Sequence, residues 1–303
     1  MNDSREGVNS RSSTLSFVMI TPARNEEATI EKTARSVTTQ TTLPSRWVVV
    51  SDGSTDRTDS IVLQYCGRYP WMVLIRLPEH ENRNFAAKVH AFNAGLEALV
   101  GVSYDIVGSL DADVSFGEDY FEFLMARFKD DPSLGVAGTP FVEDGTTYDY
   151  RFTSIEHVSG ACQLFRRECF EQIGGYVPIR GGGIDWTAVT TARMKGWRTR
   201  TFPERVCYHH RKMGTAGANT LGAWFQHGKK DYFLGGHPVW QVFRAAYQMK
   251  RRPFLIGGVL LLLGYVWAWI TGSERPISRS LMAFHRHEQM ARLKGFLFRE
   301  GTN

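Results

Sequence analysis

The stretch VVVSDGSTDRT, Val48–Thr58, joins three consecutive valines directly to a polar loop that carries two carboxylates, Asp52 and Asp56. Valine favours a buried strand, and Asp, Gly and Ser are common residues of the turn that ends one. A simple turn would therefore account for this stretch on its own. Whether the loop also binds a ligand depends on what the rest of the chain places beside it.

From Leu15 to Leu110 the chain repeats a unit of apolar strand, polar loop and helix. The apolar runs are LSFVMI from Leu15, WVVV from Trp47, WMVLIRL from Trp71 and YDIVGSL from Tyr104. Strands that alternate with helices predict right-handed crossovers, and so an α/β fold with a mainly parallel, Rossmann-like sheet flanked by helices. Ligands of such sheets bind beyond the carboxyl ends of the strands. The loops after Ile20, Val50 and Leu110 lie at that edge, so the opening loop is a candidate ligand site.

The composition is that of a globular protein of 303 residues, 43% hydrophobic and 22% charged, with room for one large domain and an appendage or for two domains. The four cysteines form no C-x-x-C pair, which favours free thiols in a reduced, cytosolic compartment. Residues 1–14 are polar, so we expect a disordered N-terminus and no secretory signal. The net charge of +5 suits a phosphorylated ligand, an anionic membrane or nucleic acid. Without a recognisable basic-aromatic motif, we expect no nucleic-acid partner.

Asp111-Ala112-Asp113 follows the fourth apolar run. The two-residue period of a strand puts both carboxylates on one side, where two hard oxygen ligands can hold Mg²⁺ or Mn²⁺. Asp-x-Asp is also common by chance, so the motif alone is compatible with two unrelated carboxylates. Its position at the same sheet edge as the Asp52 loop favours a joint site.

Four motifs, taken in order, resemble the family 2 glycosyltransferases, which are inverting nucleotide-sugar enzymes of the GT-A fold. The motifs are TPARNE from Thr21, DGSTD from Asp52, NRNFAAKVHAFNAG from Asn82 and DAD from Asp111. The resemblance covers roughly Leu15 to Lys212. It implies the GT-A fold, a nucleotide-sugar donor and a divalent cation, Mn²⁺ or Mg²⁺.

The resemblance also implies a set of donor-binding residues. These are Thr21, Pro22, Ala23, Glu26, Asp52, Gly53, Lys88, Asp111, Ala112 and Arg211. The first motif would contact the base or ribose, and Asp52 would hydrogen-bond the base. Asp111 would face the ribose or sugar, while Asp113 would bind a cation that bridges the diphosphate. Lys88 would lie near the sugar or phosphates, with a solvated helix lysine as the alternative, and Asp56 would cap the next helix.

Inversion also requires a general base that takes the proton of the acceptor hydroxyl. The family commonly places it in an acidic pair at the start of a helix, and RGGGIDW offers Asp185, with Ile184 at the position of the other acid. A helix N-cap is the alternative role for Asp185. By the same resemblance, Gly160 and Ala161 would line the sugar pocket on the acceptor side, and Trp186 is a further acceptor contact.

The segment CYHHRK, Cys207–Lys212, follows a predicted strand and joins two histidines to two cations. Such a run can reach a diphosphate, and a histidine can complete the coordination of a metal ion. We predict His210 as the metal ligand and Arg211 as a donor contact. His209 as the functional histidine and ordinary strand-end roles are the alternatives.

The run FLIGGVLLLLGYVWAWIT, Phe254–Thr271, contains no charged residue. As a helix it would extend about 27 Å, slightly less than the hydrocarbon core of a bilayer. Basic residues on both flanks conflict with the positive-inside rule for a single span and suit a monotopic or re-entrant segment on an anionic leaflet. A buried core helix is the alternative, and the glycines would permit close packing, including packing in a homo-oligomer. We expect membrane association.

The sequence therefore predicts an inverting glycosyltransferase on the cytoplasmic face of the cell membrane. Its donor would be a nucleotide sugar, UDP-linked by default, and its acceptor a lipid-linked saccharide or a polyprenyl phosphate in cell-surface or exopolysaccharide synthesis. Residues 15–115 would form the nucleotide-sugar half, 116–216 the acceptor-binding and catalytic half, and 217–303 the membrane-associated segment.

Two other classes of protein are alternatives to a glycosyltransferase. A nucleotidyltransferase would open with a glycine-rich loop after the first strand, whereas ITPARNEE contains no glycine. A non-catalytic membrane scaffold would have no need of four carboxylates, Asp52, Asp111, Asp113 and Asp185, in these positions. Both classes fit the sequence less well than a glycosyltransferase.

Overall fold

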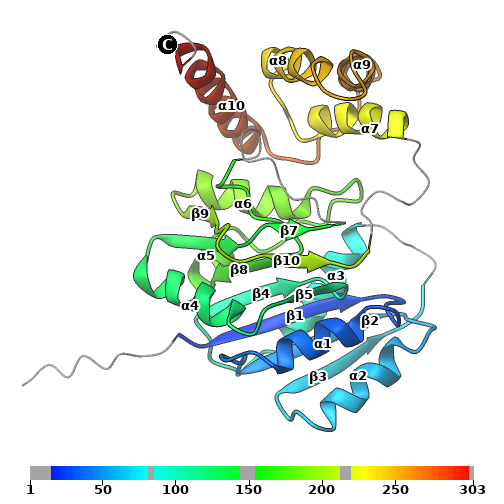
Figure 1. Ribbon diagram of the computed structural model, residues 1–303, viewed down its shortest axis with the longest axis vertical. Coiled ribbons are helices and arrows are strands. Elements are labelled where there is room, and N and C mark those ends of the chain that lie inside the picture. Colours follow the sequence, from blue (N-terminus) through cyan, green and yellow to red (C-terminus); the bar gives the residue numbers. More distant parts are fainter. Residues whose placement is uncertain (1–14, 81–84, 144–153, 212–219, 300–303) are drawn as a thin grey trace, which may run out of the picture.

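A computed structural model describes residues 15–80, 85–143, 154–211 and 220–299. The N-terminal segment 1–14, predicted to be disordered, lies outside these residues. Seven strands form one sheet in the order β3-β2-β1-β4-β8-β6-β9 (Figure 1). They are β1 Phe17–Ala23, β2 Arg46–Asp52, β3 Met72–Leu77, β4 Ile106–Leu110, β6 Leu134–Gly138, β8 Cys162–Arg166 and β9 Arg198–Thr201. Only β8 runs antiparallel to its neighbours in this sheet, so the predicted mainly parallel α/β sheet is confirmed.

Helices cover both faces of this sheet (Figure 1). They are α1 Ile30–Thr38, α2 Thr58–Cys66, α3 Phe85–Glu97, α4 Tyr120–Asp130, α5 Arg167–Gln172 and α6 Ile184–Met194. Side chains of α1, α2 and α4 share one buried cluster with the sheet, and those of α3, α5 and α6 share the other. The central strands are buried on both faces, which is why their sequences are continuous apolar runs.

A small second sheet extends from the edge where β4 ends. It contains β5 Val114–Phe116, β10 Cys207–His209 and β7 Phe141–Val142, in that order. In the antiparallel β5–β10 pair, His209 lies opposite Val114. The second sheet therefore brings a histidine from late in the chain to the residue that follows Asp113.

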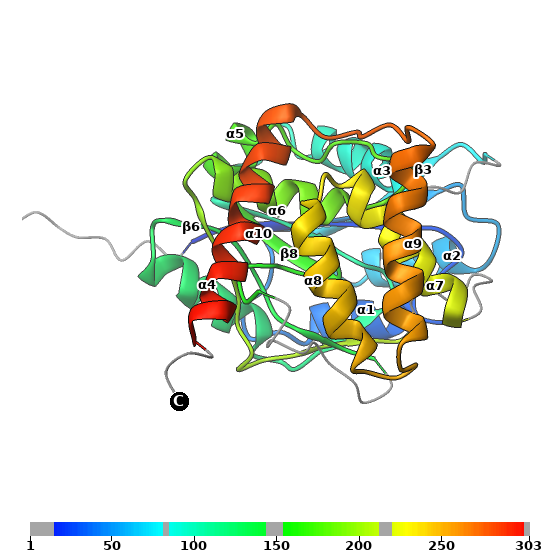
Figure 2. The same ribbon diagram turned by 90° about the horizontal axis from the view of Figure 1, so that it is seen from above.

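Four C-terminal helices fold back over α6. They are α7 Thr220–Phe233, α8 Pro238–Met249, α9 Ile256–Ile270 and α10 Arg279–Arg299. Seen from above, α10, α8 and α9 run alongside one another (Figure 2). The predicted apolar helix is α9, and among the described residues none of the helices combines the length and apolarity needed to cross a membrane.

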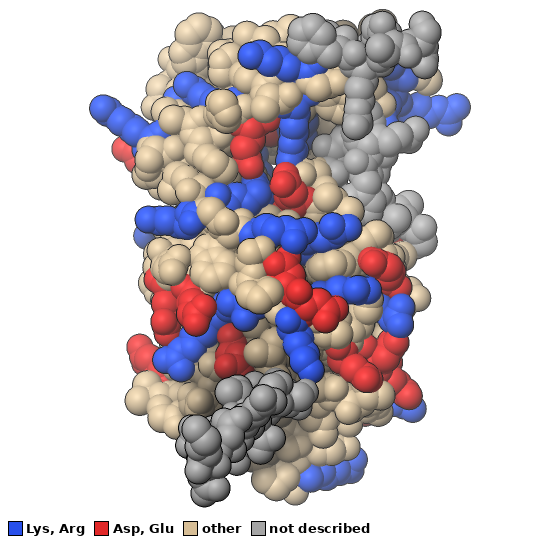
Figure 3. Space-filling model, turned by 90° about the vertical axis from the view of Figure 1, so that its left-hand side faces the viewer, with Lys and Arg blue, Asp and Glu red and all other residues tan. Residues whose placement is uncertain are grey.

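Charged side chains of both signs are interspersed on the face seen in Figure 3. Lys and Arg side chains there lie between Asp and Glu side chains. Among the described residues drawn on it, this face has no continuous basic surface of the kind that neutralises a nucleic-acid backbone.

Replacing Gly264 by alanine should destabilise the packing of α7 against α9. A Cβ at Gly264 would lie 2.0 Å from the backbone oxygen of Phe225, and one at Gly228 would lie 2.0 Å from that of Leu261. Since backbone atoms cannot move aside cheaply, we expect the free energy of unfolding to fall by about 1–3 kcal/mol. Urea denaturation of Gly264→Ala would measure this loss.

Gly222→Ala, also on α7, is the matched control. No described atom lies within 4 Å of a Cβ at this position. Alanine there should leave the stability unchanged or raise it by up to about 1 kcal/mol through helix propensity. Equal stability losses in the two variants would contradict close packing at Gly264.

Candidate active site

A cavity of about 450 Å³, here called the edge cavity, opens at the carboxyl ends of β1, β2 and β4. Four carboxylates and four cations line it: Glu26, Asp52, Asp111, Asp113, Arg24, Lys88, Arg180 and Arg211. Pro22, Ala23 and Ala112 also contribute to its wall. The charges balance, so a bound divalent cation would make the cavity net positive and suited to a diphosphate.

The loop after β2, which carries Asp52 and Asp56, contributes one carboxylate to this cavity. Asp52 ends β2, and its Oδ1 lies 2.9 Å from Nε2 of His80, which follows β3 at the same sheet edge. Asp56 instead accepts hydrogen bonds from the backbone N–H of Thr58 at 2.9 Å and of Glu27 at 3.1 Å. Although its limited burial acts to raise the pKa of Asp56, the hydrogen bonds from Thr58 outweigh that effect and lower it. Asp52 is thus the carboxylate of this loop that lines the edge cavity, and Asp56 organises the loop.

Two predicted donor contacts do not line the edge cavity. The Thr21 side chain is buried in the core, where its hydroxyl accepts a 2.9 Å hydrogen bond from Nε1 of Trp47. Gly53 has φ +66°, and a Cβ there would lie 2.8 Å from Cα of Glu79, so only glycine fits this turn. The structure therefore places the Thr21 side chain in the core and Gly53 in a tight turn, and neither lines the edge cavity.

Asp111, Asp113 and His209 form a candidate metal site. One ligand atom from each lies within 4.8 Å of the others, and Nε2 of His209 is 3.5 Å from Oδ1 of Asp113. Nδ1 of His209 is buried without a hydrogen-bond partner among the described residues, and lies 3.9 Å from Oε2 of Glu143. Two carboxylates with an imidazole nitrogen beside them, here Nε2 of His209, fit a divalent cation such as Mn²⁺.

The metal-ligand prediction for His210 is corrected to His209. The Nε2 of His210 lies 2.8 Å from Oγ of Ser115, outside the carboxylate cluster. His209 is the last residue of β10 and His210 follows it, and only the His209 side chain faces Asp113. The pairing of β10 with β5 selects His209.

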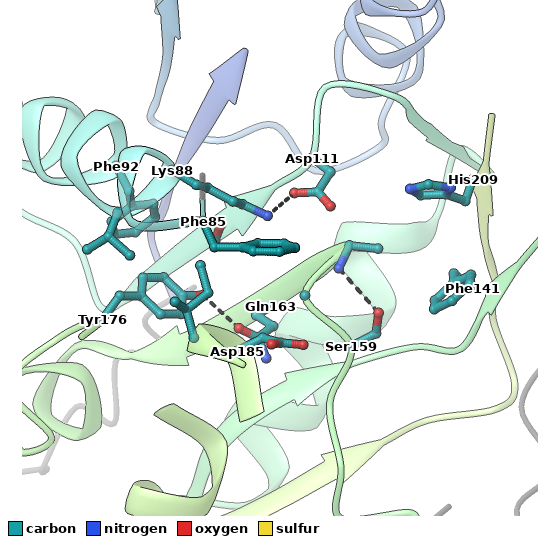
Figure 4. A pocket seen from close by; sticks show the side chains of 15 residues that line it. Phe85, Lys88, Phe92, Asp111, Phe141, Ser159, Gln163, Tyr176, Asp185 and His209 are labelled. Atoms are coloured by element: carbon teal, nitrogen blue, oxygen red, sulfur yellow. Dashed lines mark hydrogen bonds and ion pairs between the residues drawn. The ribbon is translucent and has the colours of Figure 1, made fainter. Parts of the chain in front are cut away.

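Lys88 and Asp111 form an ion pair on one side of a smaller pocket of about 150 Å³, here called the central pocket (Figure 4). Burial acts to lower the pKa of Lys88, but the Asp111 carboxylate outweighs it and the pKa is raised. Lys88 therefore stays charged and is not a solvated helix lysine. Both residues also line the edge cavity, so the two spaces adjoin.

Glu26 and Arg211 close the opposite side of the edge cavity with an ion pair of 2.9 Å between Oε1 and Nη1. Burial raises the pKa of Glu26, Arg211 opposes this shift, and the nearby Asp113 adds to it. Two predicted donor residues from distant parts of the chain are thus brought into contact.

Asp185 lies across the central pocket from Lys88 and Asp111 (Figure 4). It occupies the first turn of α6, and the N-cap is Gly183, with φ +90°. The alternative role of Asp185 as the N-cap is therefore not observed. A Cβ at Gly160 would come within 3.1 Å of Cβ of Asp185, so glycine permits this close approach. Ala161 also lines the pocket, as predicted for the acceptor side.

A third space, here called the helix cavity, has a volume of about 610 Å³ and lies between α6 and the C-terminal helices. Asp185 is the only described residue that lines both this cavity and the central pocket. Trp186 does not line the central pocket and instead faces α10, where its ring lies 4.6 Å from that of His285. The predicted acceptor contact at Trp186 thus belongs to the helix cavity.

Sequence reasoning missed several residues that line these spaces. They are Arg24, Arg180, Phe85 and the charged and aromatic side chains of α7, α8 and α10. His80, which contacts Asp52, was also missed. For His80 a signal existed, because it follows the third predicted strand at the ligand edge of the sheet.

His285 should make the protein less stable as the pH falls. Burial, reinforced by Arg193, Arg292 and Arg286, lowers its pKa from about 6.5 to about 4. Between these values the unfolded chain binds a proton that the folded protein excludes, so stability is lost as pH falls from 6.5 toward 4. Between pH 7 and pH 4.5 the free energy of unfolding should therefore fall by about 2 kcal/mol less in His285→Gln than in the native protein. Urea denaturation at the two pH values measures this difference.

The control for this measurement is His287→Gln, an exposed position on the same helix. It should show the same pH dependence as the native protein. His157 and His227, whose pKa values burial also lowers, remain in both variants. An unchanged pH dependence in His285→Gln would contradict the assignment.

The mostly parallel sheet with its flanking helices, and the candidate cation site at its edge, define a GT-A-like α/β protein. Residues 18–178 match glycosyl transferase family 2, and the chain belongs to this family. The predicted family and enzyme class, a glycosyltransferase, are confirmed.

Two curated relatives are poly-beta-1,6-N-acetyl-D-glucosamine synthases. The Staphylococcus aureus (strain COL) protein is 24% identical over 271 residues, covering 81% of this chain and 61% of the relative. The Staphylococcus epidermidis protein is 23% identical over 237 residues, covering 71% and 53%. The chain thus spans between half and two thirds of the length of these relatives.

Two solved structures share the fold. One is the mannosyltransferase PcManGT from Pyrobaculum calidifontis in complex with GDP-Man and Mn²⁺, with a TM-score of 0.55, 22% identity, and coverage of 92% of this chain and 81% of that one. The other is S. aureus TarS 1-349 in complex with UDP-GlcNAc, with a TM-score of 0.53, 15% identity, and coverage of 85% and 73%. At these identities the likeness concerns the fold.

Proposed function

We propose that the protein is an inverting glycosyltransferase that transfers a sugar from a nucleotide sugar to an acceptor hydroxyl. The order of the three cavities carries this proposal. Lys88 and Asp111 connect the edge cavity to the central pocket, and Asp185 connects the central pocket to the helix cavity. Nucleotide, sugar and acceptor would occupy them in that order.

In the proposed reaction the acceptor oxygen attacks the anomeric carbon while the bond from that carbon to the diphosphate oxygen breaks. Asp185 takes the proton of the acceptor hydroxyl, and attack opposite the leaving group inverts the configuration. Lys88 and Arg211 balance part of the charge on the departing nucleoside diphosphate. Mn²⁺ or Mg²⁺ held by Asp111, Asp113 and His209 would neutralise the rest without a proton transfer.

The donor we propose is a UDP-sugar. The names of the relatives, N-acetylglucosamine polymer synthases, and the UDP-GlcNAc complex of the fold neighbour support it. Thermal stabilisation by UDP, GDP and dTDP, each with and without Mn²⁺, tests the donor class. We expect a metal-dependent rise in melting temperature with UDP; folded protein that responds to none of the three would contradict the proposed function.

We further propose that the enzyme works on the cytoplasmic face of the cell membrane, on a lipid-linked saccharide or polyprenyl phosphate in cell-surface or exopolysaccharide synthesis. Apolar side chains form an exposed stripe along α9: Ile256, Val259, Leu263, Trp267 and Ile270. Their spacing puts them on one helix face, while the opposite face packs on α7 and α8. Exposed Lys250 and Arg252 precede the helix and Arg279 follows it, which suits an anionic leaflet.

Vesicle flotation tests this membrane docking. The native protein should float with anionic vesicles. Leu263→Glu should not, because the substitution puts a charge in the apolar stripe. Leu63→Glu on α2 is the matched control, since Leu63 is 47% exposed and Leu263 51%. A different result would be a native protein that does not bind vesicles and sediments as a dimer, with Leu263→Glu sedimenting as a monomer. The apolar stripe would then be an interface between two copies of the chain.

A further inference from the structure

The helix cavity is larger than the edge cavity and is separated from the donor side by Asp185. Apart from Asp185, its side chains have no role in the reaction described above. Most of them belong to α6 and the four C-terminal helices, while Ser154 and His157 lie within residues 18–178. Most of this wall therefore lies outside the residues that the family match covers.

Positive charge is in excess on the wall of the helix cavity. Five cations line it: Arg193, Lys230, Arg244, Arg251 and Arg292. Of the three carboxylates, Glu288 pairs with Arg193 at 2.7 Å and Asp231 pairs with Arg244 at 2.5 Å. The third is Asp185, which would act as the base. Five cations against three carboxylates leave an excess of two charges, which an anionic ligand would balance.

Part of this charge converges on one place beside Trp186. Arg193 on α6 and Arg292 on α10 line the cavity with His285, whose ring lies 4.6 Å from that of Trp186, and both act on its imidazole. Arg292 pairs with Glu156 at 3.6 Å, a carboxylate that is 52% exposed, while Glu288 forms its ion pair with Arg193. A bound anion here would reduce the mutual repulsion of these groups and favour a charged His285.

Aromatic side chains line another part of the same cavity. Trp224 comes from α7, and Trp240, Phe243 and Tyr247 come from α8. The rings of Trp240 and Phe243 lie 5.6 Å apart. Aromatic faces pack against hydrocarbon and against the apolar faces of sugar rings. A ligand that carries both an anion and an apolar or sugar portion would use both parts of the wall.

On the basis of the glycosyl transfer proposed above, we infer that the helix cavity is the acceptor site and that the acceptor carries a phosphate or diphosphate group. That group binds between Arg193, His285 and Arg292. The reacting hydroxyl lies at Asp185, and the remainder of the acceptor packs on the aromatic side chains of α7 and α8.

Calorimetric titration with inorganic pyrophosphate, in EDTA to exclude the metal site, tests the anion site. Native protein should bind it, and Arg292→Gln should weaken binding at least tenfold. Arg279→Gln, an exposed arginine on the same helix outside the cavity, should leave binding unchanged. If Arg211→Gln loses pyrophosphate binding and Arg292→Gln keeps it, pyrophosphate binds in the edge cavity and the inference is overturned. Native protein that does not bind pyrophosphate would overturn it too.

Farnesyl pyrophosphate distinguishes a lipid-borne phosphate from a soluble one. Binding at least tenfold tighter than that of pyrophosphate, with the gain lost in Trp240→Ala, would identify a lipid-linked acceptor. Equal binding of the two probes would identify a phosphorylated acceptor without a lipid. Stronger binding of farnesyl pyrophosphate that is unaffected by both Arg292→Gln and Trp240→Ala would contradict the site.

Failure of this inference is distinguishable from failure of the proposed function. Stabilisation by UDP and Mn²⁺ concerns the edge cavity alone and should be the same in native protein, Arg292→Gln and Trp240→Ala. If UDP and Mn²⁺ stabilise the native protein but pyrophosphate binds to none of the three proteins, only the inferred acceptor site is wrong. If that stabilisation is absent from the native protein, the donor assignment fails, and the pyrophosphate titration still decides what the helix cavity binds.

Discussion

Asp113→Ala is expected to abolish the Mn²⁺-dependent stabilisation by nucleotide and to reduce sugar transfer at least about a thousandfold. Asp113 is 7% exposed and supplies one of the three candidate ligand atoms. Of the others, Asp111 is already engaged by Lys88, so the remaining pair is a weak cation site. Nucleotide thermal shifts with and without Mn²⁺, together with kcat/KM for sugar transfer, measure the effect.

The same change should not unfold the protein. Asp113 acts on the neighbouring Glu26 by repulsion and raises its pKa, so its removal relieves like charges at the edge cavity. Without metal, the variant should melt at the native temperature or slightly above it. Asp130→Ala, at an exposed position on α4, is the control and should keep the metal response. An Asp113→Ala protein that still responds to Mn²⁺ with UDP would contradict the metal site.

Asp185→Asn should lower kcat by about 10²–10⁴-fold while leaving nucleotide binding unchanged. Asparagine keeps the size of the side chain but cannot take the proton of the acceptor hydroxyl. Nucleotide affinity should persist because Asp185 lines the central pocket and the helix cavity but not the edge cavity. Steady-state transfer kinetics and the UDP thermal shift separate the two effects.

Glu168→Gln is the matched control for this change. Glu168 also lies in the first turn of a helix, α5, that packs on the same side of the sheet as α6, but it is exposed and lines none of the three cavities. It should retain native kcat. If Asp185→Asn stays within about threefold of native kcat, or loses nucleotide binding, the base assignment is wrong.

Much of the fold was predictable because its signals are local. The strands around Val49 and Ile20 are buried on both faces, so their apolar runs are continuous, and each is followed by polar residues at the edge of the sheet. The Asp-x-Asp motif was predictable because it directly follows the apolar run of β4, although Asp111 and Asp113 lie in the turn between β4 and β5 and not within a strand. The first half of the fold therefore follows from patterns that extend over a few residues.

The acceptor half was less predictable because its contacts join distant segments. Trp186 was expected to contact the acceptor, and it is the packing of α6 on α10 that places it in the helix cavity beside His285. Thr21 was expected to contact the donor, but its hydroxyl accepts a hydrogen bond from Trp47 in the core. Neither outcome follows from the residues next to Trp186 or Thr21 in the chain.

By itself the sequence determined the parallel α/β sheet, the edge at which a ligand binds and the carboxylates Asp52, Asp111, Asp113 and Asp185 as candidates. Only the tertiary structure decided between His209 and His210, since that choice depends on how β10 pairs with β5. It also decided that the helices around Gly264 fold back to enclose a basic and aromatic cavity beside Asp185. The physical reason is range: periodicity fixes which side of its own element a residue takes, and packing between elements fixes what lies opposite.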